Sequence, residues 1–140
     1  MTQDRVRLDV SSILRDEGYT EASNQFDFDQ QPSTHIDRVF RVRLNRTGTV
    51  PELGLGQIEI HRLECWVARQ NGGRDPIDAC RSLTVDIERL EARIQQFALR
   101  GERFNVSDDS PETDIQQPSG DYVVGMLALD IDFDRDLAEV

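Results

Sequence analysis

Residues 75–101 read DPIDACRSLTVDIERLEARIQQFALRG, and this segment gives the clearest structural signal in the chain. Asp75 is a typical helix N-cap, Pro76 suits the first helical position, and Gly101 suits the end of a helix. Between them, apolar side chains recur at steps of three and four residues, at Ile77, Cys80, Leu83, Ile87, Leu90, Ile94 and Phe97. The segment therefore predicts an amphipathic helix over residues 76–100, with one apolar face directed to a core.

A half-buried strand is predicted before this helix, at residues 38–44. The alternation of apolar and basic residues places Phe40, Val42 and Leu44 on one face of the strand. Arg41 and Arg43 then lie on the other face. A shorter alternating strand is predicted at residues 24–31. Residues 47–55 contain two glycines and a proline and are expected to form a flexible, protruding loop.

A second, longer strand is predicted at residues 57–69. Its apolar residues lie at even positions at the start and at odd positions from Leu63 onward. Such a change of phase indicates a β-bulge or strong twist near His61–Arg62. Trp66 then lies on the face opposite Cys65 and Val67, where a helix or a partner would cover it.

The remaining segments complete the predicted architecture. An amphipathic helix is expected over residues 3–17 with Gly18 at its end, a short strand over 102–106, and a last strand over 122–133. Residues 108–120 are expected to be an irregular, flexible loop. The sequence thus predicts an α+β fold, a mostly antiparallel sheet of about five strands with two helices packed on it. We expect one domain, residues 1–140, with a short acidic C-terminal tail.

Composition excludes several chemistries. The 140 residues carry a formal charge of −11, and all 16 basic residues are arginine. A chain without lysine has no P-loop lysine, no Schiff-base amine and no kinase strand lysine. A strongly acidic domain is also a poor general binder of duplex DNA. Neither an export signal nor a membrane span is recognisable, so we expect a soluble protein made in the cytoplasm with reduced cysteines.

No catalytic, metal-binding or cofactor-binding residue is predicted. The repeated aspartates from Asp130 to Asp136 lack the glycine and glutamate of a calcium loop, and strand neighbours two apart are about 6.6–6.8 Å from each other. We interpret them as a solvated or interface-facing acidic edge. His61 and Cys65 would lie about 13 Å apart on their strand, too far to share an ion.

The arrangement of charge is more informative. Residues 102–140 carry 11 acidic residues and two arginines, whereas basic residues gather in one segment at Arg38, Arg41, Arg43 and Arg46. These arginines and the aspartates Asp130, Asp132 and Asp134 either pair across strands within one sheet or join one subunit to the next. The second arrangement is a heterologous contact, which builds a ring when the rotation closes.

The whole chain resembles the tail terminator (tail completion) proteins of long-tailed bacteriophages. The resemblance covers the N-terminal amphipathic helix, the strand RVFRVRL at 38–44, the strand at 57–69, the helix capped by Asp75 and Pro76, and the last strand GDYVVGMLALDIDF at 120–133. It implies a virion structural protein, assembled in the host cytoplasm, whose hexameric ring caps the tail tube and stops its polymerisation.

The same resemblance implies the partners. They are further copies of the chain, the tail tube protein and a head-completion or neck protein, while DNA passes through the lumen without specific binding. Members of the family are not enzymes and use no cofactor. Two alternatives stay open at this point. One is another neck or baseplate structural protein, and the other is a small metal-dependent nuclease that uses paired aspartates. A DNA-mimicking inhibitor is disfavoured because arginines offset most acids before residue 102.

Overall fold

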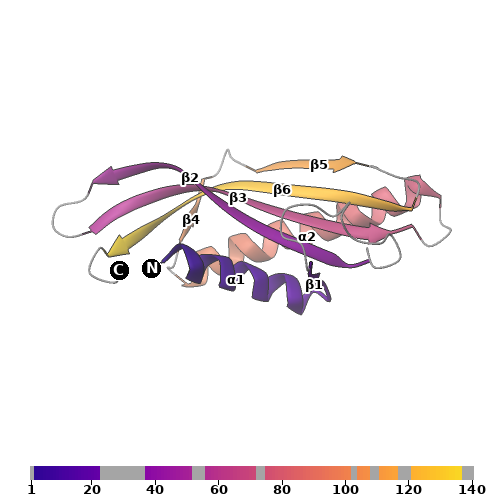
Figure 1. Ribbon diagram of the computed structural model, residues 1–140, viewed down its shortest axis with the longest axis horizontal. Coiled ribbons are helices and arrows are strands. Elements are labelled where there is room, and N and C mark those ends of the chain that lie inside the picture. Colours follow the sequence, from indigo (N-terminus) through magenta and orange to yellow (C-terminus); the bar gives the residue numbers. More distant parts are fainter. Residues whose placement is uncertain are drawn as a thin grey trace.

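Figure 1 shows two helices on one side of a long, twisted sheet. The computed structural model describes residues 2–22, 37–51, 56–71, 75–101, 104–107, 111–116 and 121–136. The elements are α1 (Gln3–Asp16), β1 (Thr20–Glu21), β2 (Val39–Pro51), β3 (Gly56–Gln70), α2 (Pro76–Gly101), β4 (Asn105–Val106), β5 (Glu112–Gln116) and β6 (Tyr122–Asp136). The sheet order is β1-β2-β3-β6-β4, and β5 also pairs with β6. Among the strands in these ranges only β1 and β2 pair in parallel, so the predicted α+β fold is confirmed.

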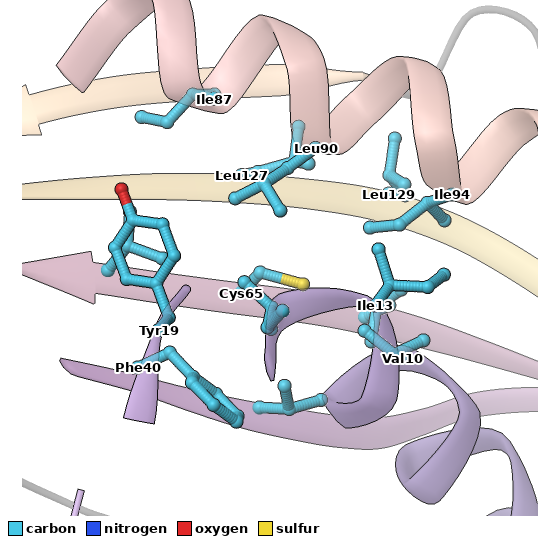
Figure 2. Close-up of a cluster of buried hydrophobic side chains, with 14 of the residues drawn as sticks. Val10, Ile13, Tyr19, Phe40, Cys65, Ile87, Leu90, Ile94, Leu127 and Leu129 are labelled. Atoms are coloured by element: carbon cyan, nitrogen blue, oxygen red, sulfur yellow. The ribbon is translucent and has the colours of Figure 1, made fainter. Parts of the chain in front are cut away.

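α2 matches the helix predicted from residues 75–101 and supplies much of the core. The backbone N–H of Ile77 donates to Asp75 Oδ1 at 3.0 Å, as expected of an N-cap. The inward face of α2 is buried through Leu83, Ile87, Leu90 and Ile94. Figure 2 shows the last three of these side chains near Leu127 and Leu129 of β6, in one apolar cluster. The helix is held by apolar contact with the sheet.

α1 covers the β2 side of the same sheet face. Thr2 caps the helix by accepting a hydrogen bond from the N–H of Arg5 at 3.2 Å. Gly18 has a φ of 92°, the left-handed conformation expected at a helix end, and the chain turns there into Tyr19. Val10 and Ile13 point into the core beside Phe40 and Cys65 (Figure 2). Both helices therefore close one core on one face of the sheet.

The expected loop at residues 47–55 is wrong for its first part. β2 continues to Pro51, and Gly48 to Pro51 pair with residues 57–60 of β3. Residues 52–55 lie outside the described residues. The glycine and proline misled because an edge strand tolerates both: its outer N–H groups need no ladder partner.

The expected bulge near His61–Arg62 lies on the other strand. The register of β2 and β3 shifts between Arg46 and Gly48, opposite Ile60 and His61, so Thr47 is the extra residue. β3 itself keeps one phase, and its odd residues from Glu59 to Val67 are all buried. The apolar pattern seemed to change phase because Glu59 and His61 are polar and yet occupy buried odd positions. They contact each other there, with His61 Nε2 3.3 Å from Glu59 Oε1.

The expected irregular loop at 108–120 is also wrong in part, because residues 112–116 form β5 along β6. β5 has a single apolar residue, Ile115, and is held by backbone pairing, which leaves no hydrophobic pattern to detect. β1 was not expected either, and β4 is shorter than the strand predicted at 102–106. The strand predicted at 24–31 and the C-terminal tail from residue 137 lie outside the described residues.

Gly125 marks the closest approach of α2 to β6. A Cβ added at Gly125 would collide with Ile87 Cδ1 and lie 3.1 Å from Leu83 Cδ2. We predict that Gly125→Ala lowers the free energy of unfolding by about 1–3 kcal/mol, as overpacking does. Denaturant titration measures this. Gly48→Ala is the control, because its Cβ meets only Ile60 Cδ1 at 3.8 Å. Equal stability of the Gly125→Ala variant and the wild type would contradict the packing described.

Candidate functional site

The far face of the sheet, opposite both helices, carries most of the residues singled out from the sequence. It is formed by the even-numbered residues of β3, β5 and β6 and by the odd-numbered residues of β2 before its bulge. Among the described residues no helix covers it (Figure 1). Across it run rows of neighbouring side chains, for example Arg43, Glu64, Ala128 and Glu112.

The structure separates the four predicted arginines. Arg41 and Arg43 lie on the far face, as predicted from the alternation in β2. Arg46 lies on the helix side, where its Nη1 is 3.6 Å from Glu59 Oε1. Arg38 precedes β2, is exposed and has a φ of 51°. The basic segment is therefore not one continuous stripe on a single face.

Asp130, Asp132 and Asp134 share the far face with Arg41 and Arg43, but β3 runs between them. β6 is an interior strand, flanked by β3 and by β4 and β5, so the interpretation of these aspartates as a sheet edge is wrong for Asp130 and Asp132. Asp132 Oδ1 accepts a hydrogen bond from Asn105 Nδ2 of β4 at 3.0 Å. No direct cross-strand pair joins the predicted arginines to the predicted aspartates.

Their actual neighbours come from β3 and were missed. Glu64 lies opposite Arg43, and Arg62 lies opposite Asp130. Arg62 Nη2 also donates a hydrogen bond to Glu112 Oε2 at 2.9 Å. This bond is the main cause that raises the pKa of Arg62 above its ordinary value. Arg62 thus links β3 to β5 across β6. If residues 57–69 are assigned one unbroken period of two, the even-numbered Arg62 and Glu64 fall on the same face as Arg41 and Arg43.

An apolar cluster occupies one end of the far face. Trp66 packs there against Ala68, Val124 and Tyr122, and the Arg41 guanidinium lies 4.9 Å from the centre of the Trp66 ring. This is a cation–π contact. Arg41 is only 8% exposed, so its side chain is largely shielded from solvent. Among the described residues, the expected cover of Trp66 is therefore an arginine of its own sheet.

Several titratable groups of the core contact one another. Tyr19 donates a hydrogen bond to Asp86 Oδ2 at 2.6 Å, and burial followed by this bond raises the pKa of Tyr19. Arg69 Nη1 lies 3.2 Å from the same carboxylate oxygen. The three residues tie the segment after α1 to α2 and β3. His61 stacks on Phe133, with ring centres 4.9 Å apart, beside Glu59.

Within the part of the chain that the structure describes, no three His, Cys, Asp or Glu side chains gather as a metal site. His61 and Cys65 lie on one face of β3, four residues apart, as predicted. A groove of about 280 Å³ between the helices is lined by Ile13, Phe97, Gln96, Arg93 and Arg100. Arg93 is held there by Glu17 at 2.9 Å.

A scan against protein-family models finds no match to this chain, and a search of curated proteins finds no significant relative. No helix within the described ranges is long and apolar enough to cross a membrane.

Cys65 tests the burial of the core. Desolvation raises the pKa of its thiol to about 12, so the thiol stays protonated near pH 8. We predict that a thiol reagent labels native protein at the half-buried Cys80 and spares Cys65. The Cys80→Ser variant isolates the buried thiol, which should react only after unfolding. Rapid labelling of this variant in its native state would contradict the described core.

Proposed function

We propose that this chain is a structural subunit of a phage tail that assembles into a closed ring, in the role of a tail terminator. The observation that carries this proposal is the opposite charge of the two edges of its sheet, with β2 toward one edge and β5 and its neighbour β6 toward the other. β2 carries three arginines and no acidic residue, whereas β5 and β6 together carry six acidic residues and one arginine. One side of a subunit is thus complementary to the other side of the next.

Such complementarity favours a heterologous contact. Two identical basic sides repel each other, as do two acidic sides, so a two-fold contact through either side is disfavoured. A head-to-tail contact joins unlike sides at every interface. Arg38, Arg43 and Arg46 then belong to the β2 edge of each contact. Glu112 and Asp114 of β5 belong to the other edge, with the aspartates of the interior strand β6 behind them. A ring of this kind satisfies every subunit equally.

The acidic residues also suit a lumen through which DNA passes. The far face carries more carboxylates than guanidinium groups, and an excess of negative charge repels phosphate and prevents adhesion. Its acidic residues are Glu64, Glu112, Asp114, Asp130, Asp132 and Asp134, and its arginines are Arg41, Arg43 and Arg62. The ring so proposed caps the tail tube, stops its growth and offers a surface to a head-completion or neck protein. It would be assembled in the host cytoplasm and end in the virion tail.

The alternatives draw less support. A neck or baseplate ring would use the same two sides, and only the partner distinguishes it from a terminator. A metal-dependent nuclease would rely on Asp130 and Asp132. Neighbours two apart on a strand lie about 6.6–6.8 Å from each other, and Asp132 is already bound to Asn105.

The assembly is tested by mass in solution. Light scattering at low salt should give a particle near 96 kDa, six times the 16.0 kDa of one chain. Because the contact joins opposite charges, we expect dissociation toward 16.0 kDa as salt rises to about 1 M, where the screening length is only about 3 Å. A particle of 16.0 kDa at high concentration and low salt would refute the ring.

The terminator role needs a second experiment. The chain is added to tail tube protein of the same phage during polymerisation, and tube lengths are measured by electron microscopy. We expect shorter, capped tubes that grow no further when more tube protein is added. A ring that leaves tube length unchanged would favour the neck or baseplate alternative.

A further inference from the structure

We propose that neighbouring copies join by strand pairing at the sheet edges, with β2 of one copy antiparallel to β5 of the next. This inference rests on the proposed ring and names its interface. Within the described ranges, β2 and β5 each have one strand edge with little or no partner strand. β1 pairs with β2 only at Val39 and Phe40, so the rest of β2 has no described strand on that side. β5 pairs only with β6, and four of its five residues are exposed.

The backbone groups at these edges follow from the ladder. The carbonyls of Arg38 and Phe40 accept hydrogen bonds from the N–H groups of Thr20 and Ala22, so even-numbered residues of β2 point their backbone away from β3. In an antiparallel sheet, successive residues direct their backbone N–H and C=O groups to opposite edges of the strand. When this alternation is followed through the registers of β3 and β6, the backbone groups of the even-numbered residues of β5 point toward β6. Thr113 and Ile115 therefore present their N–H and C=O groups to the free edge.

The directions of the strands are also compatible. β2, β3, β6 and β5 alternate in direction across the sheet because each neighbouring pair is antiparallel. The two edges consequently run in opposite directions. A rotation axis along the strands keeps these directions, so β5 meets β2 of the next copy in antiparallel fashion. The sheet would continue from copy to copy without a change of pattern.

The side chains match in one specific register. When Thr113 lies opposite Leu44 of the neighbour, Asp114 lies opposite Arg43 and Ile115 lies opposite Val42. Asp114 and Arg43 are both on the far face, and Ile115 and Val42 are both on the helix side. Opposite charges thus meet on one face, and apolar side chains meet on the other.

Gln3 presently occupies one of the edge groups. Its Nε2 donates to the carbonyl oxygen of Leu44 at 3.2 Å, in an exposed hydrogen bond. A docking strand replaces this side-chain donor with a backbone N–H. This exchange leaves the ladder between β2 and β3 intact.

The interface is tested by removing one edge donor. Thr113→Pro deletes an N–H that points away from β6, and proline is tolerated at such a position of an edge strand. We expect the concentration at which half of the chains assemble to rise by about tenfold or more. Thr113→Val, which keeps the N–H and a side chain of similar size, should assemble like the wild type. Far-ultraviolet circular dichroism and thermal melting establish that both variants fold.

A mixing experiment covers the case in which Thr113→Pro fails to fold. Arg43→Asp alone and Asp114→Arg alone each place like charges at every contact and should assemble poorly. Mixed in equal amounts, they restore opposite charges at each contact and should recover ring-sized particles. If the wild type forms rings, and the two single charge variants and Thr113→Pro assemble equally well, the edge pairing is overturned but the ring is not. Wild-type protein that never assembles would instead overturn the proposed function.

Discussion

β3 and β6 pair along their whole lengths, from Gly56 opposite Asp136 to Gln70 opposite Tyr122. This unbroken register decides which side chains of the two strands face the helices and which lie on the far face. A slip by one residue would exchange the two faces. The register directs Leu63, Leu127 and Leu129 toward the helices, and it brings α2 so close that a Cβ at position 125 would collide with Ile87. The same register sends Arg62 and the aspartates of β6 to the far face. Core and charged surface thus share one cause.

The elements with strong local signals were predictable from the sequence. The capped, periodic helix at 76–100 and the strands at 38–44, 57–69 and 122–133 all lie where the patterns indicate. The failures have physical reasons. β5 has a single apolar residue and depends on backbone pairing with a strand that follows it in the chain. Glu59 and His61 are buried against the rule for polar residues because they contact each other, which made the phase of β3 look broken.

The candidate surface was predictable only in part. The alternation in β2 correctly put Arg41 and Arg43 on one face, but the sequence does not tell which strand separates them from Asp130 and Asp132. Nor does it tell that Arg41 covers Trp66, or that Arg62 reaches Glu112 across β6. Strand order comes from long-range contacts. The complementary edges, β2 and β5, emerge only once that order is known.

The central claim is that unlike edges of successive copies meet, and a disulfide tests it most directly. In the proposed register Arg43 and Asp114 form a non-hydrogen-bonded antiparallel pair, whose Cα atoms lie about 4.5 Å apart, within reach of a disulfide. Within one chain β3 and β6 intervene, and the two positions are also offset by two residues along the strands, so they are about 16 Å apart. Oxidised protein carrying Arg43→Cys and Asp114→Cys should give a ladder of linked copies that ends at the size of the ring and disappears on reduction. Ring-sized particles whose chains all remain unlinked would contradict the account.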